Sequence, residues 1–346
     1  MPKWMRAGST AAAVAVLLTG CAGSSEQPTA AESTASEDAL VVYVGRSEEL
    51  VGPLLEQFRQ ASGVEVAARY GDTAELAAQM LEEGDRTPAD VFFSRDAGAL
   101  QAVSEAGLLT PLPKGTLKKV PATYRAADGD WIGASGRARV LVYNEDLVQP
   151  DDIPDTVAEL TDARWKGQVG IAPTNASFQS FVTAMRVTQG EAATQEWLDG
   201  LVANDVQRFE NNVAIRDAVD AGQISVGLAN HYYWFEKAAE VGAENLAVQN
   251  HFMAPGDPGT LVNVAGVGVT GAGAENPDAQ AFVDFLLGEQ AQEYFATETS
   301  EYPLVASVER AEGLPPLAKV QGPDISLEQL ADVAGTQQLL QQAGLL

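Results

Sequence analysis

The stretch LVVYV at residues 40–44 is a short apolar strand pattern, and the residues that follow it decide the fold class. Strand and helix patterns alternate after it, with a helix over residues 50–61, a strand over 64–70, a helix over 73–83 and a strand over 90–94. Alternation of this kind is typical of a mostly parallel sheet that is covered by helices. We therefore predict an α/β fold.

A second series of strand and helix patterns begins at residues 139–144. It continues with a strand over 169–174, a helix that Gly190 ends, a helix over 213–221 and a strand over 224–229. The globular part of about 300 residues is long enough for two domains. No Pro- or Gly-rich linker separates the two series, so we expect two interleaved lobes between which the chain crosses more than once.

The N-terminus has the pattern of an export signal. A basic segment precedes an apolar run at residues 11–18, which is shorter than the roughly 20 residues that span a bilayer. The sequence LTGC at 18–21 resembles the bacterial lipobox, in which the cysteine is lipidated. We therefore predict a signal peptide over residues 1–20, a lipid anchor on Cys21 and a disordered tether over 21–38. Such a protein is exported and held at the outer face of the cell membrane, in the periplasm if the host has an outer membrane.

Composition narrows the possible partners. Only one cysteine is present, which excludes disulfides. The formal net charge is −27, and no cluster of Lys and Arg follows the chain in the way that a phosphate backbone requires. We therefore expect no binding to nucleic acid.

The pentapeptide NHYYW at residues 230–234 is the strongest indication of a binding site. Its two tyrosines, Tyr232 and Tyr233, follow the apolar strand pattern over 224–229. Tyrosines at the end of a strand can present two phenolate oxygens to one ligand, and hard cations such as Fe(III) prefer these oxygens to sulfur. The alternative is an aromatic pair with one ring in the core and one at the rim.

Three polar positions coincide with predicted strand ends or helix starts: Asn175, Asn211 and Tyr232. In open sheets of this type, ligands bind beyond the carboxyl ends of strands and beside helix N-termini. We therefore expect these positions to meet in one cleft.

The catalytic motifs in the sequence are incomplete or misplaced. The sequence GVGVTG at 266–271 spells a dinucleotide fingerprint, which requires a turn between a strand and a helix. It lies within a strand-like run over 261–270, and the next helix begins at Pro277 with Asn276 as its cap. The sequence GASG at 133–136 lacks the second spaced glycine of a nucleophile elbow.

The two histidines, His231 and His251, are too few for a His-rich zinc site, and either is interpreted as a solvated or hydrogen-bonded surface residue. No set of Ser, His and Asp is identifiable by spacing. We therefore expect neither an enzyme nor a catalytic cofactor.

Eight short motifs run along residues 40–345 in a characteristic order: VYVG at 42–45, PADVFFS at 88–94, SGRARV at 135–140, WKG at 165–167, APT at 172–174, NHYYW at 230–234, DPG at 257–259 and EYPL at 301–304. Together they resemble the ferric-ion-binding proteins of bacterial ABC importers, the group likened to transferrin. The resemblance implies the two-lobed type II periplasmic-binding-protein fold, with two hinge strands and a cleft that closes on its ligand.

On this resemblance we predict that lobe 1 comprises residues 39–138 and 264–313, and lobe 2 residues 139–263 and 314–346. The resemblance also implies a monomeric solute-binding protein that delivers its ligand to the membrane permease of an ABC importer.

The resemblance further implies that Tyr232 and Tyr233 bind Fe(III) as the transported ligand. An anion, for which carbonate, phosphate and citrate are the candidates, completes the metal shell. The positions that match its binding residues are Asn175, Ala176, Ser177, Asn211 and Asn230. Arg137 matches an arginine that some members use for the same anion, and its alternative role is that of a salt-bridged hinge residue.

Two first-lobe positions depart from the family pattern. Ser47 stands where well-studied members have His, and Arg95 stands where they have Glu. The tyrosine that other members carry within residues 175–178 is also absent. The positive charge of Arg95 disfavours a bare metal ion.

Two sources remain for the missing carboxylate. One is Glu48, Glu49 or Asp96, and the other is a larger anion that binds iron as a chelate. We include Ser47 and Arg95 among the predicted anion-binding residues. Their structural alternatives are a helix cap for Ser47 and a solvated surface pair for Arg95 with Asp96.

Two other functions stay open at this point. One is the same scaffold binding an iron-free anion, such as a phosphonate or an organic acid. The other is an envelope hydrolase, against which the absence of a nucleophile motif argues.

Overall fold

The computed structural model describes residues 39–346 of the chain. The predicted signal peptide, the tether and Cys21 lie outside the described residues. Among the helices of residues 39–346, none combines the length and the apolar character that crossing a bilayer requires.

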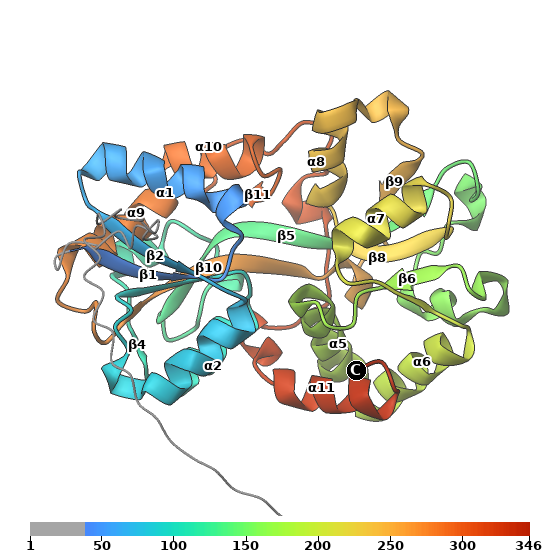
Figure 1. The fold of residues 1–346 in the computed structure, drawn as a ribbon, viewed down its shortest axis with the longest axis horizontal. Helices are drawn as coiled ribbons and strands as arrows, with labels where there is room; N and C mark the ends of the chain where they lie inside the picture. Colours follow the sequence, from blue (N-terminus) through green and yellow to red (C-terminus); the bar gives the residue numbers. More distant parts are fainter. Residues whose placement is uncertain (1–38) are drawn as a thin grey trace, which may run out of the picture. The chain divides into compact units, whose positions relative to one another are not determined.

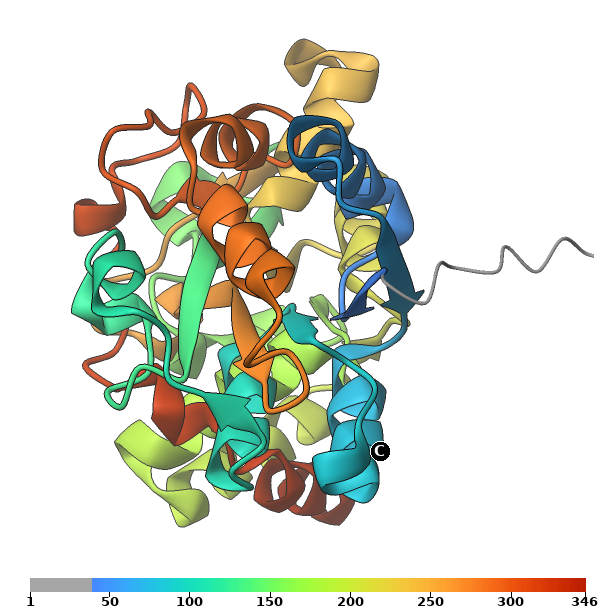
Figure 2. The same ribbon diagram turned by 90° about the vertical axis from the view of Figure 1, so that its left-hand side faces the viewer.

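The first half of the described chain alternates strands and helices as predicted. Its elements are β1 (Leu40–Val44), α1 (Glu48–Ser62), β2 (Val66–Tyr70), α2 (Thr73–Glu83), β3 (Val91–Ser94), α3 (Ala97–Glu105), β4 (Leu109–Thr110) and α4 (Lys114–Leu117). Strand β1 lies between β2 and β3 and runs parallel to both. Figures 1 and 2 show α1 on one face of these strands and α2 on the other. The prediction of a helix-covered parallel sheet is confirmed for this half.

Two long strands connect this half to the second one. They are β5 (Trp131–Asn144) and β10 (Val262–Thr270). The strand order is β2-β1-β3-β10-β5-β8-β6-β7, with β10 antiparallel to both β3 and β5. Strand β5 pairs with β10 up to Ala138 and with β8 from Arg139 onward, so one strand belongs to both halves (Figure 1).

The second half contains the elements that carry the predicted binding residues. They are β6 (Val169–Ile171), α5 (Ala176–Gln189), α6 (Glu191–Ala203), β7 (Gln207–Arg208), α7 (Asn212–Asp220), β8 (Val226–Asn230), α8 (Tyr232–Val241) and β9 (Val248–His251). Strand β6 runs parallel to β7 and β8, whereas β5 is antiparallel to β8 and β9. Each parallel strand ends where a helix of the same half begins, which brings the helix N-termini to one edge.

The C-terminal elements return to both halves. They are α9 (Pro277–Leu286), α10 (Glu289–Thr297), β11 (Tyr302–Pro303) and α11 (Val333–Gln342). Phe282 of α9 packs edge-on against Phe58 of α1, with ring centroids 5.1 Å apart, and a contact of this kind contributes about 0.5–1.5 kcal/mol beyond the burial of its area. Helix α11 lies instead against α5, where the hydroxyl groups of Thr336 and Thr183 are 2.7 Å apart. The residue ranges of the two lobes remain a prediction.

Strand β10 contains the GVG part of the apparent dinucleotide fingerprint, and all nine of its residues are buried. Helix α9 begins at Pro277, and the side chain of Asn276 accepts a hydrogen bond from the backbone N–H of Asp278. The interpretation of these glycines as strand residues is therefore confirmed.

Candidate functional site

A cleft of about 520 Å³ lies between residues of the two halves. Its lining residues are Arg46, Ser47, Glu49, Leu50 and Arg95 from the first half, Asn175, Asn211, Val213, Tyr232, Tyr233 and Glu236 from the second, and Glu298. The prediction that Asn175, Asn211 and Tyr232 meet in one cleft is confirmed. Ser47 and Arg95 line the same cleft, so six of the predicted site residues come together here.

The two tyrosines form the first turn of α8, directly after the end of β8. Their ring centroids are 4.2 Å apart, and Tyr232 is buried whereas Tyr233 is partly exposed. Burial, and then the neighbouring Tyr232 hydroxyl, raise the pKa of Tyr233 well above its usual value. A metal that binds this pair as phenolates must therefore displace its protons. One ring is deeper than the other, as in the aromatic-pair interpretation, but both line the cleft.

Helix N-termini supply further polarity to the cleft. The Asn175 side chain accepts a hydrogen bond from the Ser177 N–H at 3.0 Å, and α5 begins with Ala176 between them. Asn211 caps α7 by accepting from the Ala214 N–H at 2.9 Å. Because the N-terminal ends of α5, α7 and α8 carry partial positive charge, the second-half side of the cleft favours an anion.

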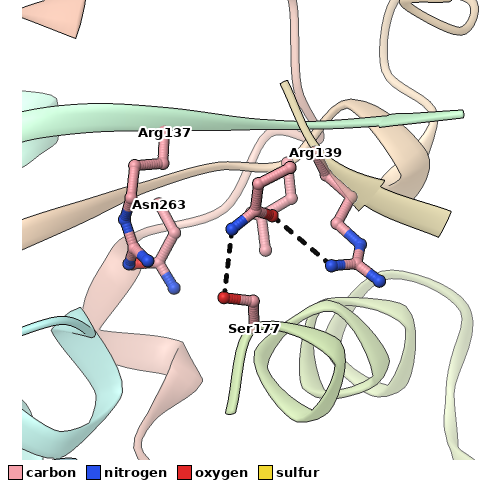
Figure 3. A pocket seen from close by; sticks show the side chains of 6 residues that line it. Arg137, Arg139, Ser177 and Asn263 are labelled. Carbon is pink, nitrogen blue, oxygen red and sulfur yellow. Dashed lines mark hydrogen bonds between the residues drawn. The ribbon is translucent and has the colours of Figure 1, made fainter. Parts of the chain in front are cut away.

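A second, smaller cavity is lined by three of the other predicted anion-binding residues, Arg137, Ser177 and Asn230 (Figure 3), whereas Ala176 lines neither cavity. Its lining residues are Arg137, Arg139, Ser177, Asn230, Leu261 and Asn263. Asn230 donates a hydrogen bond to the Ser177 hydroxyl at 3.2 Å and accepts one from Arg139 at 3.4 Å (Figure 3). The cavity has a volume of about 10 Å³, which accommodates no more than a single water molecule.

Arg137, on β5, lies beside a buried carboxylate, as its alternative role of a salt-bridged hinge residue requires. It is 3% exposed, its Nε lies 3.9 Å from a carboxylate oxygen of Glu301, and it donates a hydrogen bond to the backbone carbonyl of Arg95. Glu301 also accepts from Arg46 at 3.0 Å and from the Ser135 hydroxyl at 2.9 Å. This buried network connects the first-half wall of the cleft to β5.

Arg139 is a further buried cation behind the tyrosines. Burial lowers its pKa to about 9, while Tyr233 and Tyr232 act in the opposite direction. Its guanidinium lies 5.7 and 5.6 Å from the ring centres of Phe178 and Phe181 on α5. It also donates to the Leu228 carbonyl at 3.0 Å, so it holds α5 against β8.

The first-half wall offers few anionic ligands. Ser47 stands at the N-cap position of α1, as its structural alternative requires, but its side chain makes no capping hydrogen bond. Arg95 is partly exposed, and its charge acts on Tyr233 from across the cleft. Asp96 is buried, caps α3, and accepts hydrogen bonds from Ser180 and Asn263. The interpretation of Asp96 as part of a solvated surface pair is therefore wrong.

His231 is fully buried, so its interpretation as a surface residue is also wrong. Its Nδ1 accepts a hydrogen bond from the Ala138 N–H at 3.1 Å, and its Nε2 lies 2.8 Å from the Ser300 carbonyl. Burial lowers the pKa of His231 to about 4. The neutral ring fastens the start of α8 to β5 and to the segment before β11.

Sequence reasoning missed Glu236. It lies on α8, one turn beyond the tyrosine pair, and lines the cleft with them. Burial raises the pKa of its carboxyl group to about 7. Its spacing of three from Tyr233 and four from Tyr232 was the signal available in the sequence, because residues so spaced share one face of a helix.

Comparisons with known proteins show the family to which the chain belongs. Residues 86–325 match the family of bacterial extracellular solute-binding proteins. The major ferric iron-binding protein of Neisseria meningitidis is 36% identical over 324 residues, which cover 91% of this chain and 97% of that protein.

Two solved structures share the fold. Iron-bound HitA from Pseudomonas aeruginosa has a TM-score of 0.84 at 32% identity and covers 88% of this chain and 99% of its own. A Trichodesmium protein in complex with iron and citrate has a TM-score of 0.77 at 31% identity and covers 89% of this chain and 100% of its own. The expectation of a type II periplasmic-binding-protein fold is confirmed.

The family match extends over more than half of the chain, and the Neisseria protein aligns with nearly all of it. The similar proteins are binding proteins of iron transport rather than enzymes, so the hydrolase alternative is removed. The chain belongs to the bacterial extracellular solute-binding proteins, in the group that includes the ferric iron-binding proteins.

Proposed function

We propose that this protein captures ferric iron outside the cytoplasm through Tyr232 and Tyr233, together with an anion or as an anionic chelate, and delivers it to the permease of an ABC importer. The observation that carries the proposal is the tyrosine pair facing Arg95 across one cleft. Two phenolates are hard oxygen donors for Fe(III), and an arginine attracts an oxyanion.

An anion explains why a metal site contains arginines. Arg46 and Arg95 line the cleft with the tyrosines, yet a guanidinium cannot coordinate a metal. An oxyanion that bridges the iron and an arginine satisfies both charges, and the N-termini of α5 and α7 add donors beside it. Carbonate, phosphate and citrate all have this chemistry, and the Trichodesmium relative holds iron with citrate.

Ferric titrations test the requirement for an anion. The purified mature chain is titrated with Fe(III) while carbonate, phosphate and citrate are each withheld in turn, and the phenolate-to-iron absorption band is followed. We expect a coloured complex whose affinity depends on the anion. A colourless protein that takes up neither ferric citrate nor ferric phosphate contradicts the proposal.

The same cleft supports a second candidate function, the capture of an iron-free anion such as a phosphonate or an organic acid. Arg46, Arg95 and the helix N-termini favour it, because none of these groups requires a metal. Calorimetric titration with such anions after chelation of all iron distinguishes the two. Tight binding without iron favours the second function.

Cleft closure belongs to the proposal. We infer that two lobes close around the ligand when it binds. Lobe 1 comprises residues 39–138 and 264–313, and lobe 2 comprises residues 139–263 and 314–346. Small-angle scattering should report a smaller radius of gyration for the loaded monomer. Equal radii with and without a tightly bound ligand contradict closure.

Export and membrane attachment through a lipid on Cys21 complete the proposal. The motif LTGC at 18–21 supports them. Replacing Cys21 with Ala should move the protein from the membrane fraction to the medium or the soluble envelope fraction. Unchanged retention on the membrane contradicts the anchor.

A further inference from the structure

The Glu236 carboxylate has no partner among the described residues that would explain its position. It lies partly buried on α8 and lines the cleft with Tyr232 and Tyr233. A partly buried carboxylate is normally paired or hydrogen-bonded, because removing a charge from water costs free energy. No hydrogen bond or ion pair of its side chain occurs within residues 39–346.

Two arginines, Arg216 and Arg46, act on Glu236 through their charge, but both are bound to other groups. Arg216 donates to the Asp217 carboxylate at 2.8 Å and to the Tyr233 carbonyl at 2.8 Å. Arg46 donates to Glu301 at 3.0 Å. Glu236 is therefore not held in the cleft by a structural ion pair.

The helix geometry brings the three oxygen donors together. Residues three and four apart lie on the same face of a helix, so Glu236 follows Tyr233 and Tyr232 on the face that lines the cleft. The rings of the two tyrosines lie with their centroids 4.2 Å apart, and burial, together with the smaller effect of the Glu236 charge, raises the pKa of Tyr233. All three oxygen donors thus come from the first two turns of α8.

The charge of a ferric ion requires more than the tyrosines provide. Two phenolates supply two negative charges against three positive ones. The first-half wall offers Ser47 and Arg95 at the positions where a neutral or anionic ligand is expected. A carboxylate is a hard oxygen ligand, and Glu236 balances the third charge.

Two other carboxylates line the cleft, but neither has the same placement. Glu49 and Glu298 are exposed, and both belong to elements other than α8. Water stabilises an exposed carboxylate without any ligand. The position of Glu236 is thus the one in the cleft that a bound cation explains best.

We propose that Glu236 supplies a carboxylate oxygen to the ferric ion beside Tyr232 and Tyr233. This assignment rests on the proposed function of the tyrosine pair. It makes α8 the element that provides all three anionic protein ligands, and it leaves Arg95 to bind an exogenous anion.

The test compares matched Glu→Gln variants of the full mature protein. Glu236→Gln removes the charge and keeps the shape of the side chain. Glu240→Gln makes the same change on an exposed residue of α8, and Glu298→Gln makes it on an exposed residue of the same cleft. Ferric affinity is measured by competition with citrate, and the visible band is recorded for each protein.

We expect Glu236→Gln to weaken ferric binding by at least about 100-fold, the upper end of the range for the loss of an outer-shell partner. The tyrosine band should remain and shift, because the phenolates stay bound while one ligand changes. The Glu240→Gln control should bind as the unmodified protein does, and Glu298→Gln should lose clearly less ferric affinity than Glu236→Gln. A partial recovery in Glu236→Asp supports direct coordination over an effect of charge alone.

Two results overturn the assignment. One is a Glu236→Gln variant with unchanged affinity and band, and the other is an equal loss in Glu298→Gln, which shows that only the overall charge of the cleft matters. Thermal unfolding of the metal-free variants checks that each one folds. Failure of the proposed function is separate, because the unmodified protein then shows no visible band with iron.

Discussion

The two walls of the cleft have opposite chemistry. The second-half wall presents Tyr232, Tyr233 and Glu236 from the start of α8, and the first-half wall presents Arg46 and Arg95. The first set can coordinate a hard cation, whereas the second can only bind anions. The difference teaches that, in the proposed site, one wall supplies all the protein ligands of the metal and an anion joins it to the other wall.

The largest effect is expected when both tyrosines of the second-half wall are replaced. We expect the double variant Tyr232→Phe/Tyr233→Phe to lose the visible band and all measurable ferric binding, because no phenolate is left. Each single variant should lose more than the roughly 100-fold that outer-shell changes cost. Citrate competition and absorption spectra check both. Retention of the band in the double variant would show that iron binds through other residues.

The second test measures how much the buried ion pair between Arg46 and Glu301 contributes to stability. Glu301→Gln leaves Arg46 without its buried carboxylate, and breaking one side of a buried ion pair costs about 3–5 kcal/mol. We expect the free energy of unfolding of the metal-free variant to fall by that amount, which urea titration measures. Glu298→Gln, at an exposed position, should change stability by less than about 0.5 kcal/mol. Equal stabilities of the two variants would mean that the network contributes little.

The third test concerns His231, the buried residue that joins the start of α8 to β5. Burial lowers the pKa of His231 from 6.5 to about 4, so between these values the unfolded chain binds more protons than the folded one. The free energy of unfolding of the metal-free protein should therefore fall as the pH drops from about 6.5 to 4, by about 3 kcal/mol from this residue. In His231→Gln this part of the pH dependence should vanish. Parallel urea-midpoint curves for the two proteins would contradict the expectation.

The smallest effect is expected when Arg95 of the first-half wall is replaced by a carboxylate, the kind of group that the second-half wall presents. Arg95→Glu places a carboxylate opposite the tyrosines, so iron binding should depend less on added anion, by about tenfold for one charge-assisted hydrogen bond. The ratio of ferric affinities with and without carbonate or phosphate measures this. A ratio unchanged from that of the unmodified protein would remove Arg95 from the anion site.

Periodicity predicted most helices because their ends are marked by local chemistry. Helix α2 has the predicted bounds, since Asp72 caps its start and Gly84 ends it. Strand β5 is longer than predicted, because its first half, WIGASGRA, has a single β-branched residue, Ile132, and is held by pairing with β10 and β11. Such long-range pairing has no local signal in the sequence.

The candidate site divides in the same way. The tyrosines and the capping asparagines carry local signals, and the sequence placed them in one cleft correctly. The burial of His231 and of Asp96 depends on contacts with Ser300 and Asn263, which are distant in the chain. Glu236 was missed because the sequence analysis treated the tyrosines as the end of a strand rather than the first turn of a helix.

The shared strands β5 and β10 also affect how this chain can fold. Until residues 262–270 have been synthesised, β3 and β5 each lack the neighbour that separates them in the sheet. The first-half sheet therefore completes its hydrogen bonding only after β10 has been made, and pairing between such distant segments slows folding. The strand pairs of the second half, in contrast, all lie within residues 139–251. A nascent chain with this topology completes its first half late, and an open chain of this kind is compatible with the export that we propose.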